Sequence, residues 1–455
     1  MPAERTTTRR VLTLADLPRP APNAIASWVK LWTKPEPARL DLATLGGRFA
    51  IDLPLLPKMF WTARSEDARA VFQDKTGALS FGAGLRRIAP HERLFGDRIM
   101  SWWASDDHLA TRRKVLPAFR GTALAEYEPA IEAVARRVIR DLPVGEPVRF
   151  HSAMRTLARD VIIAVVFGVT ESDRHDRLAG LLTRLDERIG SRAFAARYAF
   201  SMVAGGRWLP DRDLDELLAG IDAFTYDEMT DRRRRGDEST SDCLGVFMDL
   251  QRGVDDQSLD DEMIAGFQRL LLLAGQDTTA ATLAWAVELL ARSPDALGAL
   301  QRSVAAGEDR YLDAVVLETL RLRPTIGFTV RSALESVVVD DVVVPEGAMV
   351  FVYINAIHRD PENYEHPDEF RPERFLDTTP DASTWLPFGG GINRCLGERM
   401  ALLEARTLLR TLIQELDVVP TDTPHEAQRA ETILMVPDKG ATVTFRPRRA
   451  ATTST

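Results

Sequence analysis

The chain is poor in cysteine, with only Cys243 and Cys395 among its 455 residues. Two cysteines cannot form the disulfide framework of a small secreted scaffold, so that class of protein is excluded. Free thiols are typical of a reducing compartment. The cysteine content therefore predicts a cytoplasmic protein.

The chain also lacks a long apolar run near its start and an excess of positive charge. The stretch from Met1 to Trp32 carries basic residues, but no apolar run in it approaches the roughly 20 residues that a spanning helix needs. Nor does it hold the apolar region of a signal peptide. The formal net charge of -9 argues against general binding to nucleic acid. We therefore expect no membrane span and no nucleic-acid partner.

Glycines surround Cys395 on both sides. Gly389 to Gly391 precede it and Gly397 follows it, and glycine leaves the backbone free of side chains where a flat partner could lie. Small and apolar residues then recur at helical spacing through Leu408. Cys395 is therefore predicted near a helix N-terminus, where amide groups and the helix dipole favour the thiolate, the form that ligates iron. The alternative is an inert thiol in a glycine-rich turn.

The longest helical pattern runs from Asp260 to Ala291 and contains Ala274-Gly275-Gln276-Asp277-Thr278-Thr279 at its centre. Gly275 removes a side chain where something flat could lie against the helix. Threonine hydroxyls can bond to backbone carbonyls and bend a helix. Asp277 and Thr278 together form an acid and alcohol pair suited to passing protons. The alternatives are a back-bonded threonine and a surface aspartate.

Two further patterns place charges on helix faces. His108 and Arg112 lie four residues apart in the predicted helix from Trp103 to Phe119, so they share a face. The alternative interpretation is that this face is a solvated basic surface. In the predicted helix from Val315 to Leu322, Glu318 and Arg321 lie three residues apart and can pair.

The segment Phe388-x-x-Gly391-x-x-x-Cys395-x-Gly397 resembles the haem-binding loop of the cytochrome P450 family, the haem-thiolate monooxygenases. The oxygen-side pattern, the Glu-x-x-Arg pattern and the His-x-x-x-Arg pattern stand in the family's order, and the resemblance runs from about residue 71 to residue 445. It implies a mainly α fold with a smaller β-rich lobe. It also implies one domain over 1–455, with 1–20 as a strap and 447–455 as a tail, in place of the three domains that length suggests.

The resemblance assigns roles to individual residues. Cys395 would ligate the iron of haem b, with Asp277 and Thr278 delivering protons during dioxygen activation. Asn393 stands where the family usually has Arg or His, so either its amide or the neighbouring Arg394 is the candidate contact there. The cofactor would also contact His108, Arg112, Ala274, Gly275, Arg331, Phe388, Gly389 and Gly397. A structural network would join Glu318, Arg321 and Arg374. The substrate pocket would be lined by Leu271, Ala274, Ile326, Phe328, Leu434 and Met435.

The segment between Thr170 and Arg235 is charged and helical, with a break at 205–210, and the resembled family uses this region as a mobile lid. The run from Arg232 to Arg235 is interpreted as a solvated helix face. Residues 81–96 hold several glycines without clean periodicity and are predicted as a loop. In the resembled fold this region covers the substrate pocket. Four lid aromatics either face substrate or pack in the core: Phe194, Tyr198, Phe200 and Trp208.

The implied reaction inserts one atom of dioxygen into an apolar small molecule, by hydroxylation or epoxidation. Electrons would come from NAD(P)H through a ferredoxin or flavodoxin and its reductase, docking on Arg112, Arg113, Lys114 and Arg399, and we expect a monomer. The alternatives are a peroxide-driven or non-redox haem-thiolate enzyme and a non-catalytic haem-binding protein.

Overall fold

The computed structural model describes residues 11–448 apart from 21–25, 27–29, 31–41, 43, 55, 89–90, 105–107, 170–171, 205–206, 208, 237–240, 253–258 and 432. Most of the predicted tail, the first half of the predicted strap and Trp208 therefore lie outside the described residues. In the rest of the strap, β1 (Leu12–Thr13) pairs in parallel with β8 (Val342–Val344).

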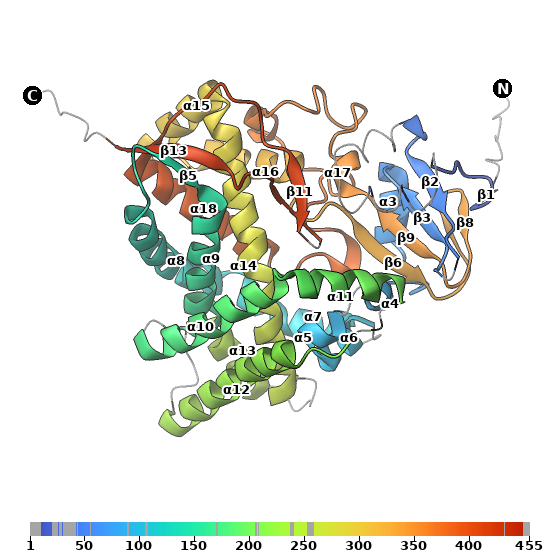
Figure 1. Cartoon of the computed structure of the whole chain (residues 1–455), viewed down its shortest axis with the longest axis horizontal. Helices are drawn as coiled ribbons and strands as arrows, with labels where there is room; N and C mark the ends of the chain where they lie inside the picture. The colour runs from blue at the N-terminus through green and yellow to red at the C-terminus, as the bar shows by residue number, and fades with distance from the viewer. Residues whose placement is uncertain are drawn as a thin grey trace, which may run out of the picture.

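Helices dominate the described chain and gather on one side of the molecule, whereas most strands lie on the other (Figure 1). The predicted mainly α fold with a smaller β-rich lobe is therefore confirmed. The helices are α3 (Ser65–Phe72), α4 (Phe81–Ile88), α5 (His91–Phe95), α6 (Asp97–Ala104), α7 (His108–Val115), α8 (Thr122–Arg140), α9 (Phe150–Phe167), α10 (Ser172–Ile189), α11 (Arg192–Val203), α12 (Arg212–Arg235), α13 (Cys243–Arg252), α14 (Asp261–Ala291), α15 (Pro294–Ala305), α16 (Arg310–Leu322), α17 (Ile354–Ile357) and α18 (Glu398–Glu415).

The β-rich lobe is built on a five-stranded sheet in which β3 and β9 are parallel and the other neighbours antiparallel. Its order is β2 (Arg48–Ile51), β3 (Met59–Thr62), β9 (Met349–Val352), β6 (Thr329–Ala333) and β4 (Leu79–Ser80). The smaller sheets have the orders β1-β8-β7, β10-β13-β5 and β11-β12, with β7 (Val337–Val339), β10 (Leu416–Val418), β13 (Thr442–Pro447), β5 (Pro147–Arg149), β11 (Gln428–Glu431) and β12 (Leu434–Pro437).

Helix α14 runs through the middle of the helical part (Figure 1). The Asp260 side chain caps it by accepting a hydrogen bond from the Met263 amide at 2.8 Å. Among the described residues, α14 is the one helix long and apolar enough to cross a membrane, and 61% of its most apolar window is buried in the molecule. These properties equally fit a core helix, and α14 packs against α9, α12, α16 and α18.

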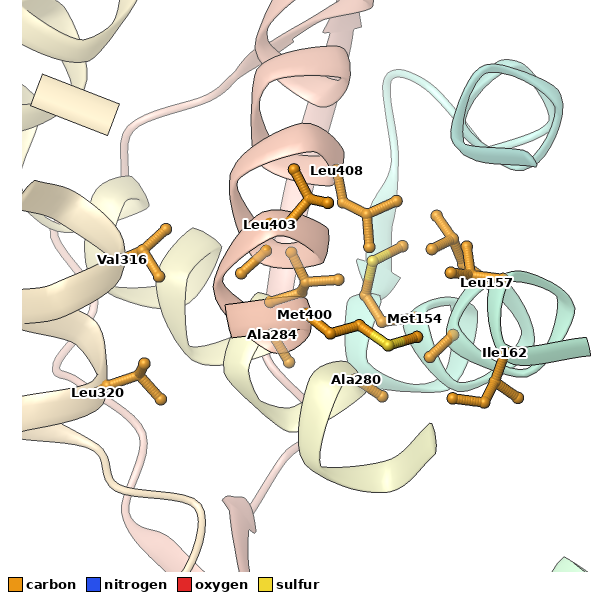
Figure 2. Close-up of a cluster of buried hydrophobic side chains, with 14 of the residues drawn as sticks. Met154, Leu157, Ile162, Ala280, Ala284, Val316, Leu320, Met400, Leu403 and Leu408 are labelled. Carbon is orange, nitrogen blue, oxygen red and sulfur yellow. The ribbon is translucent and has the colours of Figure 1, made fainter. Parts of the chain in front are cut away.

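The centre of the core lies where α9, α14, α16 and α18 meet (Figure 2). Met154 of α9, Ala280 of α14 and Met400 of α18 point toward one another there, and Val316 of α16 faces the same cluster. Full burial of one such large side chain is worth roughly 1.5–3 kcal/mol. This packing fixes the first turns of α18 beside the middle of α14.

The prediction of a loop over residues 81–96 was wrong, because α4 and α5 occupy most of it. A Cβ atom on Gly84 would lie 3.1 Å from backbone atoms of Arg331, so this glycine lets α4 press closely on β6. Close packing on the sheet thus outweighs the low helix propensity of glycine, which costs about 1 kcal/mol relative to alanine.

The lid region is helical as predicted, with α11 ending before the break and α12 starting after it. Phe194 and Tyr198 are buried and stack on each other at 6.2 Å, whereas Phe200 is exposed. The interpretation of a solvated arginine run was wrong for Arg232, which is buried. Arg232 donates to Glu228, Asp242 and the Phe167 carbonyl oxygen.

Candidate functional site

The loop before α18 holds Cys395 in a tight turn. The Cys395 amide donates to the Phe388 carbonyl oxygen at 2.9 Å, which closes the turn. Gly389 and Gly391 have φ of +67° and +69°, a region that residues with side chains rarely adopt. Gly397 then takes the N-cap position of α18. The structure therefore places Cys395 three residues before a helix, as the sequence predicts.

Two of the three glycines do not serve a flat partner, which corrects the sequence interpretation. A Cβ on Gly391 would lie 2.3 Å from the Phe72 carbonyl oxygen, and one on Gly390 would lie 2.5 Å from the Phe72 ring. Both glycines therefore let the loop touch the end of α3. Gly389 differs, because a Cβ there would meet nothing within 4 Å.

The Cys395 thiol has a raised pKa, mainly because burial disfavours the charged form. The Gly397 amide and the cations Arg112 and Arg394 offset this in part, and Glu398 adds to it. The side chain is nonetheless exposed, so it faces an open space within a crowded surrounding. The protein groups around Cys395 therefore do not by themselves stabilise the predicted thiolate. A metal cation bound to the sulfur would stabilise it.

Helix α7 lies against the cysteine loop. The His108 Nε2 atom is 3.2 Å from the Ile392 carbonyl oxygen and 3.3 Å from the Asn393 side-chain nitrogen. Arg112 donates to the Cys395 carbonyl oxygen at 3.4 Å. His108 is buried, so the pair is not a solvated basic surface.

The neighbouring candidate, Arg394, is committed elsewhere. Its guanidinium donates twice to Glu398, one turn further along the chain, and the pair is partly buried. The Asn393 amide contacts His108 instead. Of the two residues considered for the usual contact at this position, Asn393 is therefore the one whose side chain lies against α7.

Arg331 is a buried cation with aromatic neighbours. Its guanidinium lies 5.6 Å from the Phe72 ring centre and 4.9 Å from that of Phe81. It donates to the Thr329 hydroxyl and the Val330 carbonyl oxygen, and burial lowers its pKa to about 10.

Arg331 and Arg112 share an electrostatic property. Burial lowers the pKa of both, and neither guanidinium forms an ion pair among the described residues, although Glu398 and Asp74 act on them at longer range. Desolvated cations without counter-ions are costly unless an anion binds them. Phe72 links Arg331 to the cysteine loop that Arg112 contacts, because it touches both the Arg331 guanidinium and the glycines of that loop. Two carboxylates of one ligand would satisfy both cations.

At the centre of α14, Ala274 is exposed even though the helix is largely buried. Gly275, by contrast, faces α9, where a Cβ would lie 2.5 Å from Ile162 Cδ1. The prediction that Gly275 clears space for a flat partner was therefore wrong, and Ala274 is the residue that borders open space. The Thr278 hydroxyl donates to the Ala274 carbonyl oxygen at 2.7 Å, which is the back-bonded arrangement.

Asp277 is not a lone surface charge. Arg155 of α9 donates from Nε to Asp277 Oδ1 at 2.9 Å, and its Nη2 atom lies 3.5 Å from Asp186 Oδ2 on α10. Gln276 donates to the same Asp186 oxygen at 2.7 Å. Sequence reasoning missed Arg155 and Asp186, because nothing in either helix pattern shows that they meet α14.

Glu404 of α18 is another residue that the sequence analysis missed. It is fully buried, accepts a hydrogen bond from Thr279 at 3.1 Å, and burial raises the pKa of its carboxyl group to about 7. The sequence did contain a signal for it, because Glu404 is a charged residue among the apolar positions that α18 buries. Glu404 can therefore hold or release a proton near neutral pH. Its contact, Thr279, is the chain neighbour of Thr278.

The predicted pocket residues separate into two groups. Ala274 is exposed and Leu271 half-buried on α14, while half-buried Ile326 and Leu434 form a β-bridge with each other. Phe328 and Met435 are 4% and 1% exposed and therefore lie in the core. We withdraw these two from the pocket. Phe328 packs on the rings of Trp61 and Phe351, and the Met435 carbonyl oxygen accepts from Trp285.

The predicted charge network is present behind the site. Arg321 donates to both carboxylate oxygens of Glu318, at 2.7 and 2.9 Å, and both side chains are fully buried. Arg374 donates to Glu318 at 3.1 Å. Arg321 also donates to the carbonyl oxygens of His358 and Pro367, so it ties α16 to the segment before the cysteine loop.

The donor set fits haem better than a metal held by protein alone. Among the described residues, no three His, Cys, Asp or Glu side chains cluster as ligands. Cys395 is an isolated thiol, and a porphyrin that provides its own nitrogen ligands needs only one such axial ligand. With two cations for two carboxylates, these residues fit a haem.

Comparison with known proteins agrees with this arrangement. Residues 57–445 match the sequence model of the family described as Cytochrome P450. Cytochrome P450 137 of Mycobacterium tuberculosis is 35% identical over 390 residues, which cover 84% of this chain and 79% of the relative. Cytochrome P450 135B1 of Mycobacterium bovis is 32% identical over 367 residues, covering 78% and 76%. Neither name states a substrate.

A solved structure shares the fold. The crystal structure of the cytochrome P450DA heme domain matches with a TM-score of 0.75, covering 97% of this chain and 98% of that chain. The two sequences are 21% identical, so this likeness concerns the fold.

Proposed function

The chain belongs to the cytochrome P450 family, and from this premise we propose that it is a monooxygenase that inserts one atom of dioxygen into an apolar small molecule. The observation that carries the proposal is the cysteine loop, in which the desolvated Arg112 of α7 contacts Cys395 and Phe72 links the loop to the desolvated Arg331. A cytoplasmic location, a monomeric state and a single domain over 1–455 stay predictions from the sequence.

In the proposed reaction, Cys395 would ligate the haem iron as a thiolate, and Arg112 and Arg331 would bind the two carboxylates of the haem. When bound, the haem supplies the oxygen chemistry, which a thiolate ligand promotes by donating electron density. Thr278 must turn its hydroxyl away from the Ala274 carbonyl oxygen to pass a proton, and Asp277 must loosen its bond to Arg155. These two rearrangements would set when protons reach the site.

The substrate is proposed to be apolar because the residues predicted to line the pocket that are not in the core, exposed Ala274 and half-buried Leu271, Ile326 and Leu434, are all apolar. Helices α4 and α5 and the lid helices α10 and α11 would decide its shape. Hydroxylation and epoxidation are both compatible with such a site.

Electrons are proposed to come from NAD(P)H through a ferredoxin or flavodoxin and its reductase. The docking face of this proposal comprises Leu109, Arg113, Ile392 and Arg399, all exposed and lying on α7, the cysteine loop and the start of α18. Two arginines around two exposed apolar side chains suit an acidic protein with an apolar contact area.

Two other functions are distinguishable by experiment. A peroxide-driven or non-redox enzyme would turn over without reductant, whereas the proposed enzyme requires one. A non-catalytic haem-binding protein would give no oxygenated product from a broad panel of apolar compounds, even with electron donor and reductase supplied. The proton-handling pair Asp277 and Thr278 favours dioxygen activation over both.

The decisive test is the absorbance difference spectrum of the dithionite-reduced protein with and without carbon monoxide. We expect a Soret band strongly red-shifted from that of histidine-ligated haem, and Cys395→His should move it to the histidine position. Cys243→Ser is the matched control, because Cys243 is buried beside Tyr127 and should leave the band unchanged. A folded wild-type protein without a haem band would contradict the proposal.

A further inference from the structure

One guanidinium serves two carboxylates at the contact of α9, α10 and α14. Arg155 donates from Nε to Asp277 at 2.9 Å, and its Nη2 atom lies 3.5 Å from Asp186 Oδ2. Asp186 stands in the last turn of α10, and Asp277 lies at the centre of α14. The two carboxylates therefore belong to different helices but share one cation from a third.

Asp186 is also attached to α14 directly. Buried Gln276, next to Asp277 in the chain, donates to Asp186 Oδ2 at 2.7 Å. One turn further along α9, Arg159 donates to Thr183 of α10 at 2.7 Å. The end of α10 is thus held against α9 and α14 by polar contacts in addition to buried leucines of the same helix. Polar contacts can separate and re-form at lower cost than an interlocked apolar core.

The charges around the cluster do not balance. Burial raises the pKa of Asp186, and the Asp277 carboxylate raises it further, whereas Arg155 and Arg159 lower it. Two further ionisable groups interact electrostatically with this cluster: His151, one turn before Arg155 on α9, and Glu431 of β11. Two carboxylates that share one close cation compete for it, so a change in one alters the hold on the other.

We propose that Asp186 is a positioning residue that couples the placement of α10 to the freedom of Asp277, through their shared contact with Arg155. With α10 in place, Arg155 donates a hydrogen bond to Asp277 and is also attracted to Asp186, so its hold on Asp277 is weakened and Asp277 can turn toward Thr278. When α10 moves away, Arg155 binds Asp277 alone and holds it. Closure of the lid would thereby prepare proton delivery, a consequence that rests on the proposed function.

Coupling of this kind is reciprocal. If Asp186 changes the free energy of the contact between Arg155 and Asp277, then Asp277 changes the free energy of the contact between Arg155 and Asp186 by the same amount. Neutralising Asp277 must therefore tighten the hold of Arg155 on Asp186 and on the end of α10. A role of Asp186 that is merely structural, through Gln276 alone, predicts no such response. The placement of α10 is thus a readout that does not depend on turnover.

The test is amide hydrogen exchange of residues 183–189 in the full-length protein as purified, followed by mass spectrometry. We expect Asp277→Asn to slow exchange there by roughly threefold or more, the size expected for charged groups in contact. Asp186→Asn and Arg155→Met should each speed it by a similar factor. Asp176→Asn, on the same helix with a side chain 79% exposed, is the matched control and should change nothing.

Unchanged exchange at 183–189 in Asp277→Asn would overturn the proposal, as would an equal response to Asp176→Asn. The two Asp→Asn variants keep the side-chain shape, so they remain informative if Arg155→Met does not fold. The carbon monoxide spectrum of the same samples tests the proposed function separately. A red-shifted Soret band together with unchanged exchange would refute the proposed coupling and leave the proposed monooxygenase function standing. With a normal spectrum and the expected exchange, Asp186→Asn should also divert turnover from product toward peroxide.

Discussion

A single buried carboxyl group gives the molecule a titration near neutral pH. Within the described part of the chain, the Glu404 carboxyl group accepts one hydrogen bond, from Thr279, and its Oε1 atom has no hydrogen-bond partner. Burial raises its pKa from the ordinary 4.5 to about 7, so the folded protein binds this proton more tightly than the unfolded chain does. Stability contributed by the proton is complete below pH 4.5 and is lost as the pH rises through about 7.

We predict that Glu404→Gln removes this pH dependence. The variant should be more stable than wild type at pH 8.5, by up to about 3 kcal/mol at 1.36 kcal/mol per pKa unit, and the difference should shrink toward pH 5.5. Unfolding midpoints measured at several pH values check this. Glu126→Gln on α8, where the side chain is exposed, serves as the control. Parallel wild-type and Glu404→Gln curves across this range would contradict the assignment.

At the scale of elements, two glycines show how differently a close contact can be built. Gly275 allows α14 to lie against α9, where the obstructing atom is the terminal methyl of Ile162. Gly391 allows the cysteine loop to lie against α3, where the obstructing atom is a backbone oxygen of Phe72. A side chain can be shortened by substitution, but a backbone oxygen cannot.

We predict that Gly275→Ala destabilises the protein by about 1–3 kcal/mol, the usual cost of overpacking a core. Ile162→Val removes the obstructing methyl and should rescue most of that loss in the double variant, although alone it costs about 0.5–1.5 kcal/mol. Unfolding of the four proteins in a double-mutant cycle measures the rescue. Additive losses in the double variant would show that the two residues do not compete for space.

Gly391→Ala should be worse and should not be rescued by a change at Phe72. The added Cβ meets the Phe72 carbonyl oxygen, and φ of +69° is strained for alanine. Gly307→Ala, just after α15, has a φ of +74° and open space around it, and is the control for backbone strain alone. We expect reduced haem content in Gly391→Ala beyond that of Gly307→Ala, measured as the ratio of Soret to protein absorbance.

At the scale of the whole molecule, the net charge is negative while the proposed docking face is basic. Arg399 lies exposed in the first turn of α18, beside the cysteine loop. Arg212 lies exposed at the start of α12. The two arginines occupy matched positions in their helices, so their substitution separates a local docking effect from a change in total charge.

We predict that Arg399→Glu slows electron transfer from an acidic ferredoxin several-fold at low salt, because like charges at a contact oppose association. Arg212→Glu should leave the rate close to wild type. The difference should vanish near 1 M salt, where the screening length is about 3 Å. Stopped-flow reduction at several salt concentrations checks this, and a rate that is insensitive to salt in wild type would count against the docking face.

The sequence by itself determined the family, the mainly α fold and the residues with recognisable spacing, because these depend on local pattern. The acid and alcohol pair and the Glu318 and Arg321 pair each lie within one helical turn, and the cysteine loop is one continuous short segment, so spacing alone places their members together.

Only the tertiary structure decided which residues meet across helices. Arg155 and Asp186 join Asp277 from two other helices, and Glu404 meets Thr279 across a helix contact, so no local pattern shows them. The same reason explains the errors: α4 forms because it packs on β6, and Gly275 serves α9. Burial also depends on the complete packing, and it raises the pKa of Cys395 against the helix-terminal effect that the sequence predicts.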